Sequence, residues 1–180
     1  MSAESMNASN RVKKCVAYIV IAVFAVVVDQ LSKAAIVHSF ELDNQRRTLI
    51  AGVLDLVLVH NEGAAFSIGQ GAGPIFVIVA AVFAVAALVF LWKYPSTSWF
   101  SVVCIALVVG GGLGNMIDRI RLGYVNDFFA TSFIDFPVFN VADIFVTCGV
   151  VLLLISIIFF DSDEPHKVDS SGKTSTHKGA

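Results

Sequence analysis

The stretch GGGLGNMIDRIRLGYVNDFF, residues 110 to 129, decides how this chain is interpreted. It begins with glycines at the end of an apolar run and ends in two aromatic residues. Between them lie six polar residues: Asn115, Asp118, Arg119, Arg121, Asn126 and Asp127. Only 14% of the chain is charged, so acids, amides and arginines gathered at one place require an explanation.

The composition is that of a membrane protein. Of the 180 residues, 57% are hydrophobic, and the mean hydropathy is +0.81. That is more apolar surface than a soluble domain of this size can bury. The formal net charge of −2 argues against a nucleic-acid partner, which would require a basic surface. Cys15, Cys104 and Cys148 lie in or beside apolar runs, and we interpret them as small apolar side chains.

Four apolar runs are each close to the 20 residues that a helix needs to cross a bilayer. They cover residues 16–36, 74–92, 99–117 and 139–160. The first run follows basic residues, as in a cleaved signal peptide, but Asp29, Ser32 and Lys33 interrupt it, so we expect it to stay as a membrane helix. The fold class predicted is an all-α membrane protein: a four-transmembrane-helix bundle with a small extracytoplasmic β-sheet.

The distribution of lysine and arginine favours cytoplasmic termini. On the side of the termini fall Arg11, Lys13, Lys14, Lys93, Lys167, Lys173 and Lys178, against Arg46, Arg47, Arg119 and Arg121 on the other side. We therefore expect a cytoplasmic segment over 1–15 and a transmembrane domain over 16–160. Its extracytoplasmic loops would cover 37–73 and 118–138, and a disordered cytoplasmic tail would follow over 161–180.

The first outer loop contains a candidate β-hairpin. LDLVLVH, residues 54–60, is rich in aliphatic and β-branched residues and partly alternates, which favours a strand. RTLIAGV, residues 47–53, is its candidate partner. Open strands cannot lie in lipid, so such a sheet is expected at the membrane interface.

The polar residues of the apolar domain fall at one membrane level. Three pairs have helical spacing: Asp29 with Lys33, Asn115 with Asp118, and Asn140 with Asp143. The members of each pair share a helix face. Asn61 and Asp127 lie in the outer loops on the same side. Ionisable groups at membrane depth normally face a bundle interior or a wet cavity, so these residues are predicted to form one site.

Structural roles are open for each of these features. Asp29 and Lys33 form either a plain salt bridge or a substrate-positioning pair. Asp118 and Arg119 form either an interface anchor or an orienting ion pair. The glycines at 110–114 either let a neighbouring helix approach or leave room for a ligand. Asn140 is also a candidate helix N-cap.

Two adjacent carboxylates can share a proton, so that one acts as a base and the other as an acid. Asp143 with either Asp127 or Asp118 can form such a pair and activate a water molecule to attack a carbonyl. No metal or other cofactor is expected: there is no HExxH motif, and the four histidines are divided between the outer loop and the tail. Ser67 lacks an evident base.

Five motifs in order resemble the lipoprotein signal peptidase family, the type II signal peptidases of bacteria. They are DQLSK at 29–33, HNEGAAFS at 60–67, GGGLGNMIDR at 110–119, GYVNDFF at 123–129 and FNVADIF at 139–145. The resemblance covers residues 16 to 160. Where Asn126 stands, the family more often has a small aliphatic residue.

The resemblance implies an aspartic endopeptidase of the bacterial inner membrane. Its substrate would be a diacylglyceryl-modified prolipoprotein, cleaved just before the lipidated cysteine, and its other contacts would be membrane lipids, with the enzyme acting as a monomer. The implied catalytic pair is Asp127 and Asp143. The implied supporting positions are Asp29, Lys33, Asn61, Gly63, Gly111, Asn115, Asp118, Arg119, Asn140 and Ala142.

Spacing alone does not choose between Asp118 and Asp127 as the partner of Asp143. Asp118 is in phase with Asn115 and adjacent to Arg119, which suits a structural ion pair. Asp127 follows a glycine-containing turn that can bring it back over the bundle, and we favour it. A proton-relaying channel or transporter and a membrane scaffold are the competing interpretations. Neither accounts for acids gathered at one edge of the bilayer without an internal repeat.

Overall fold

The computed structural model describes residues 3–40, 46–63 and 73–160. The predicted disordered tail over 161–180 and the motif residue Ser67 lie outside the described residues. Within these ranges the fold consists of four helices and three strands. They are α1 (Ala3–Phe40), β1 (Arg47–Ile50), β2 (Leu54–Asn61), α2 (Gly73–Lys93), α3 (Trp99–Leu122), β3 (Val125–Thr131) and α4 (Val141–Phe160).

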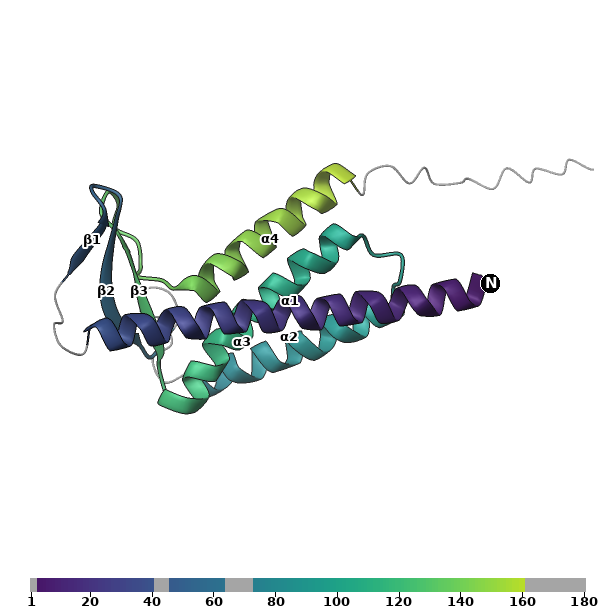
Figure 1. The fold of residues 1–180 in the computed structure, drawn as a ribbon, viewed down its shortest axis with the longest axis horizontal. Coiled ribbons are helices and arrows are strands. Elements are labelled where there is room, and N and C mark those ends of the chain that lie inside the picture. Colours follow the sequence, from purple (N-terminus) through teal and green to yellow (C-terminus); the bar gives the residue numbers. More distant parts are fainter. Residues whose placement is uncertain (1–2, 41–45, 64–72, 161–180) are drawn as a thin grey trace, which may run out of the picture.

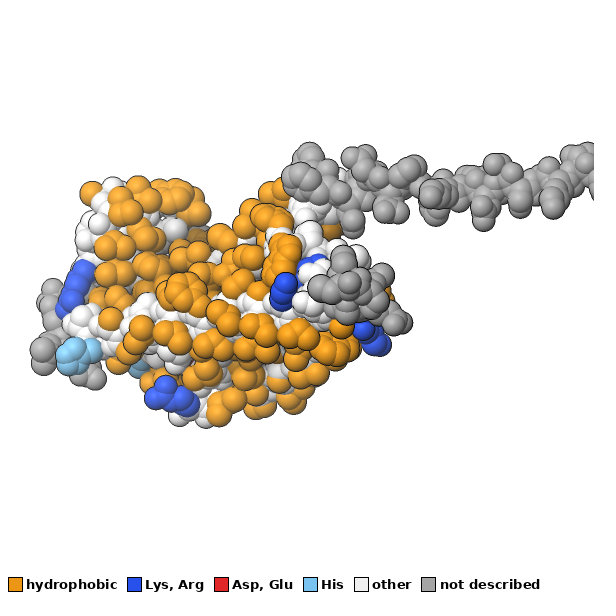
Figure 2. Space-filling model, turned by 45° about the vertical axis from the view of Figure 1, so that its right-hand side comes forward, with side chains coloured by type: hydrophobic (Ala, Val, Ile, Leu, Met, Phe, Trp, Pro, Cys, Tyr) orange, Lys and Arg blue, Asp and Glu red, His pale blue; other side chains and the backbone are white. Residues whose placement is uncertain are grey.

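All four helices are long and apolar enough to cross a membrane. Their outward side chains are large and hydrophobic: Phe24 is 62% exposed on α1, Val82 62% on α2 and Leu154 53% on α4. Figure 2 shows hydrophobic side chains over most of the visible flank of the bundle. The prediction of a four-helix membrane bundle with a small sheet is confirmed.

Helix α3 is the central element, in contact with each of the other three helices. Its glycines permit this because their neighbours occupy the space that a side chain would need. A Cβ at Gly110 would lie 2.7 Å from the Ala22 carbonyl oxygen of α1. A Cβ at Gly111 would collide with the Ala142 carbonyl oxygen of α4. The glycine-rich face therefore serves close helix packing.

Two helices extend beyond the predicted spans by more than one residue at an end. Helix α1 begins at Ala3 and ends at Phe40, where the apolar run predicted 16–36. Helix α3 continues past residue 117 to Leu122, and its last turn carries Arg119 and Arg121, whose positive charges suit a helix C-terminus. Gly123 stops it by adopting a φ of 84°, and its N–H donates to the Arg119 carbonyl oxygen at 3.1 Å.

The three strands form one antiparallel sheet in the order β1-β2-β3. The hairpin of β1 and β2 agrees with the predicted strand pair, and Gly52 in its turn has a φ of 72°. Strand β3 was not predicted: residues 125–131 were assigned to a loop. Its register with β2 places Asp127 opposite Val59 and Asn126 opposite His60. The sheet lies at one end of the bundle (Figure 1).

The opposite end of the bundle holds the start of α1, the α2–α3 connection and the end of α4 (Figure 1). Lys14 is buried there, and its ammonium donates to the carbonyl oxygens of Pro95 and Thr97. The Tyr18 hydroxyl donates to the Ala84 carbonyl oxygen at 2.8 Å. These bonds tie α1 to α2 and to the connection that follows it.

The glycines of α3 allow a matched test of this packing. Gly110→Ala would place a methyl group 2.6 Å from the Ala25 Cβ, whereas the nearest atom to a Cβ at Gly112 is 3.9 Å away. We expect Gly110→Ala to destabilise the protein by about 1–3 kcal/mol and Gly112→Ala to be tolerated. Thermal unfolding in detergent measures both, and equal midpoints for the two variants would contradict this account of helix packing.

Candidate active site

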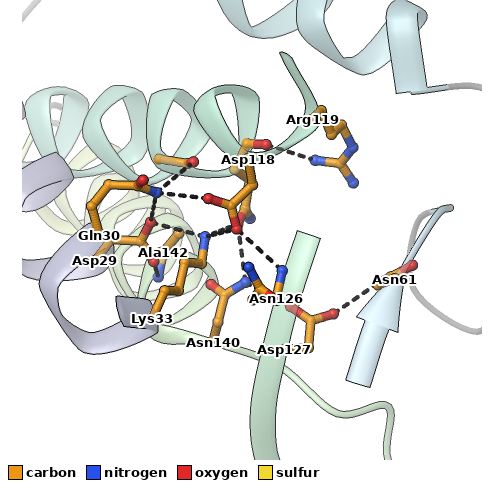
Figure 3. Close-up of polar contacts among 12 residues, drawn as sticks. Asp29, Gln30, Lys33, Asn61, Asp118, Arg119, Asn126, Asp127, Asn140 and Ala142 are labelled. Carbon is orange, nitrogen blue, oxygen red and sulfur yellow. Dashed lines mark hydrogen bonds and ion pairs between the residues drawn. The ribbon is translucent and has the colours of Figure 1, made fainter. Parts of the chain in front are cut away.

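The polar residues predicted from the sequence come together at the sheet end of the bundle (Figure 3). Asp127 comes from β3 and Asp143 from the first turn of α4. Asn140 precedes α4 and caps it reciprocally: its N–H donates to Asp143 Oδ2 at 3.0 Å, and the Asp143 N–H donates to Asn140 Oδ1 at 3.1 Å. The interpretation of Asn140 as an N-cap is therefore confirmed.

Neutral amides connect the two acids. Asn140 Nδ2 donates to Asp127 Oδ1 at 2.6 Å and to Asn115 Oδ1 at 3.0 Å. Asn115 Nδ2 donates in turn to Asp143 Oδ1 at 2.9 Å. Asn61 Nδ2 donates to Asp127 Oδ2 at 2.9 Å. Each of the four carboxylate oxygens of Asp127 and Asp143 thus accepts a hydrogen bond from the protein.

A buried ion cluster, formed by Asp29, Lys33 and Asp118, lies behind these amides. Lys33 Nζ is 2.9 Å from Asp29 Oδ2 and 3.2 Å from Asp118 Oδ2. All three residues are at most 3% exposed. Gln30, which was overlooked inside the DQLSK motif, donates to Asp118 Oδ1 at 2.9 Å.

The ion cluster ties four elements together. Asp29 Oδ1, on α1, accepts the Ala142 N–H at the start of α4 at 3.0 Å. Asp118 Oδ2, on α3, accepts the Asn126 N–H of β3 at 3.1 Å. The close approach of α1 to α3 also requires a glycine at position 114, because a Cβ there would lie 2.5 Å from Asp29 Oδ2.

Arg119 does not form the expected pair with Asp118, which is bonded to Lys33 instead. Its guanidinium donates to the Gly63 carbonyl oxygen at 2.8 Å and lies over the ring of Phe76, 4.9 Å from its centroid. Of the two interpretations that the sequence left open for Asp118 and Arg119, an interface anchor or an orienting ion pair, the ion pair is therefore wrong. Arg119 links α3 to the segment after β2 and to the first turn of α2.

A cavity of about 570 Å³ borders both acids, a volume typical of ligand sites. Its polar lining consists of Asn61, Asn115, Arg119, Asp127 and Asp143. The rest of the lining is apolar apart from Thr147, and its apolar residues are Phe76, Val125, Phe136, Pro137, Val138, Phe139, Ile144 and Cys148. These apolar residues were not predicted to line a site, because nothing in their local pattern distinguishes them from the rest of an apolar chain.

Asp127 has an unusual proton affinity for a carboxylic acid. Burial raises its pKa to about 6, and the nearby charge of Asp143 acts in the same direction. The hydrogen bonds from Asn61 and Asn140 oppose this rise. Asp127 can therefore hold a proton at a mildly acidic pH at which an exposed aspartate is ionised.

No group of three or more His, Cys, Asp or Glu residues within the described ranges is arranged to hold a metal ion. Gly63, Gly111 and Ala142, which the family resemblance singled out, contribute backbone and close packing. The Gly63 carbonyl binds Arg119, and Gly111 packs against Ala142.

The fold and the site define a class of protein. It is a multi-pass membrane protein with two carboxylates that border one cavity and are connected by hydrogen bonds through asparagine residues. The family model described as signal peptidase (SPase) II matches residues 21–159. The chain belongs to the signal peptidase II family, a family of bacterial peptidases.

Relatives and solved structures agree with this assignment. A lipoprotein signal peptidase of Lactococcus lactis is 42% identical over 78% of this chain and 92% of its own length. One of Streptococcus agalactiae is 38% identical over 82% of this chain and 95% of its own length. A bacterial membrane enzyme solved by the in meso method at 2.3 Å resolution superposes with a TM-score of 0.76 at 35% identity, covering 84% of this chain and 93% of that one.

The raised pKa of Asp127 predicts how stability depends on pH. The folded state binds this proton more tightly than the unfolded chain, whose ordinary pKa is 3.8. The resulting stabilisation is complete below about pH 4 and is lost as the pH rises through about 6. Relative to wild type, Asp127→Asn should therefore gain about 3 kcal/mol of unfolding free energy between pH 4 and pH 7.5. Unfolding measured across that range would refute the raised pKa if the difference stayed constant.

Proposed function

We propose that this chain is an aspartic endopeptidase that removes signal peptides from diacylglyceryl-modified prolipoproteins. The cleaved bond is the one immediately before the lipidated cysteine. Membership of the signal peptidase II family supports the substrate class. The observation that carries the mechanism is the pair of acids, Asp127 and Asp143, bordering one cavity and joined through Asn140.

The environments of the two acids favour different roles. Asp127 is 3% exposed and holds its proton to about pH 6. Asp143 is less buried and lies in the first turn of α4, where the helix dipole favours a negative charge. Asp127 is therefore the acid that protonates the scissile carbonyl oxygen, and Asp143 is the base that takes a proton from the attacking water.

The proton transfers of this scheme return both acids to their starting protonation states. Attack by water on the carbonyl carbon gives a tetrahedral intermediate, with one proton on Asp143 and one on the former carbonyl oxygen. Asp143 then gives its proton to the leaving nitrogen of the cysteine as the C–N bond breaks. The hydroxyl proton of the intermediate returns to Asp127 as the new carboxyl group forms.

Asp118 fits a structural role better than a catalytic one. Its Oδ1 accepts from Gln30, and its Oδ2 accepts from the Asn126 N–H and faces Lys33. It is 3% exposed and is absent from the cavity lining. Asp118 therefore holds Lys33 and β3 in place and does not border the cavity in which a substrate would bind.

The site is proposed to face the extracytoplasmic side of the bacterial inner membrane. Arg11, Lys13 and Lys93 at the opposite end support cytoplasmic termini. Lys14 adds little to this bias because it is bonded to carbonyl oxygens inside the protein. The apolar wall of the cavity includes Ile144 and Cys148 of α4, so a substrate whose acyl chains remain in lipid can enter from the side.

The proposal is tested by cleavage in detergent of a diacylglyceryl-modified prolipoprotein and of its unlipidated form. Wild type should cleave only the lipidated substrate. Asp127→Asn and Asp143→Asn should each lower the rate by about 10²- to 10⁴-fold, because each removes one partner of the proton transfer. Asp118→Asn should retain measurable cleavage.

Thermal unfolding of each variant controls for folding in this assay. Cleavage lost in folded Asp118→Asn but retained in Asp127→Asn would transfer the catalytic role to Asp118. Folded wild type that cleaves neither substrate would refute the proposed function and favour a transporter.

A further inference from the structure

We propose that Lys33 is a positioning residue that sets the orientation of the Asn115 amide and, through it, holds Asp143 in place as the proton acceptor. This inference rests on the proposed function. Lys33 does not contact substrate in this account: it is 3% exposed and is absent from the cavity lining. The hydrogen bond that Lys33 makes to the site goes to one side chain, Asn115.

The direction of the Lys33 hydrogen bonds fixes the orientation of the Asn115 amide. An ammonium group has three donors and no acceptor. Lys33 Nζ uses its donors on Asp29 Oδ2 at 2.9 Å, on Asp118 Oδ2 at 3.2 Å and on Asn115 Oδ1 at 2.8 Å. Because Lys33 can only donate, the oxygen of the Asn115 amide must face it. The NH₂ group then faces away from Lys33, toward Asp143 Oδ1 at 2.9 Å.

A second donor enforces the same orientation. Asn140 Nδ2 also donates to Asn115 Oδ1, at 3.0 Å, and the orientation of Asn140 is itself set by the Asp143 N–H, which donates to its Oδ1 at 3.1 Å. A flipped Asn115 amide would oppose an NH₂ group to two donors and an oxygen to a carboxylate. All three contacts would become unfavourable.

The two carboxylates of the ion cluster hold Lys33 where this orientation requires it. Asp29 lies one helical turn before Lys33 on α1, and Asp118 lies across from it on α3 (Figure 3). The Asp29–Lys33 pair is therefore neither a plain salt bridge nor a substrate contact. It directs one N–H of the Lys33 ammonium to Oδ1 of Asn115, at the edge of the site.

A double-mutant cycle in the Asp118→Asn background tests the relay. Lys33→Met in that background leaves the net charge equal to that of wild type, because Asp118→Asn has already removed one negative charge. We expect it to lower kcat by about 10- to 100-fold relative to Asp118→Asn alone, with little change in KM. When Asn115→Ala is also present, adding Lys33→Met should lower kcat by less than about a further threefold, because the side chain that connects Lys33 to Asp143 has been removed.

Lys14→Met is the matched control, since it removes the other buried lysine of α1, far from the site. It should lower the thermal midpoint and leave kcat of the folded protein unchanged. The positioning role of Lys33 would be refuted if Lys33→Met lowered kcat equally with and without Asn115→Ala, or if it changed only KM. Either result would leave the peptidase assignment intact. Failure of wild type to cleave would instead refute the proposed function.

Asn115→Asp tests the same inference without changing Lys33. It keeps acceptors for Lys33 and Asn140 but replaces the donor to Asp143 with an oxygen. We expect kcat of the folded protein to fall at least about tenfold and its thermal midpoint to fall as well, because two oxygens now face each other. Retained kcat in this variant would overturn the inference, even if the Lys33→Met variants did not fold.

Discussion

The buried contact of one ammonium with two carboxylates, Lys33 with Asp29 and Asp118, is the interaction on which the rest of this structure depends. An unpaired charge at this depth is costly, so α1 and α3 must meet in the register that pairs these three groups. Asp29 Oδ1, the oxygen not paired with Lys33, accepts the Ala142 N–H, and Asp118 Oδ2 accepts the Asn126 N–H as well as facing Lys33. The same ions thereby set the positions of α4 and β3, which carry the proposed catalytic acids.

Local periodicity explains why much of this arrangement was predictable. Hydropathy located four spans because lipid requires about 20 apolar residues in each. Helical spacing placed Asp29 beside Lys33 and Asn140 beside Asp143, and the structure shows both contacts. Alternation within residues 54–60 indicated β2. Each of these features depends on residues within one or two helical turns of each other, or within a single strand.

Long-range contacts account for what was not predictable. Strand β3 exists because it pairs with β2 far earlier in the chain, and its own sequence carries Asn126 and Asp127 where a strand pattern would have apolar residues. The partner of Asp118 was misassigned because Arg119 is adjacent in sequence, whereas Lys33 is adjacent in space. Asn126 and Ala142 contribute backbone N–H groups, which every residue except proline has, so no side-chain motif indicates this role.

The use of amides next to the acids has an electrostatic consequence. A lysine bonded directly to Asp127 would favour its ionised form and lower its pKa, and the acid could not then hold a proton for transfer. Here the groups that donate to Asp127 are the neutral amides of Asn61 and Asn140, and burial prevails, with a pKa of about 6. Lys33 is kept one residue further back, behind Asn115. The positive charge can therefore orient the site without abolishing the proton-holding form of Asp127 on which the proposed chemistry depends.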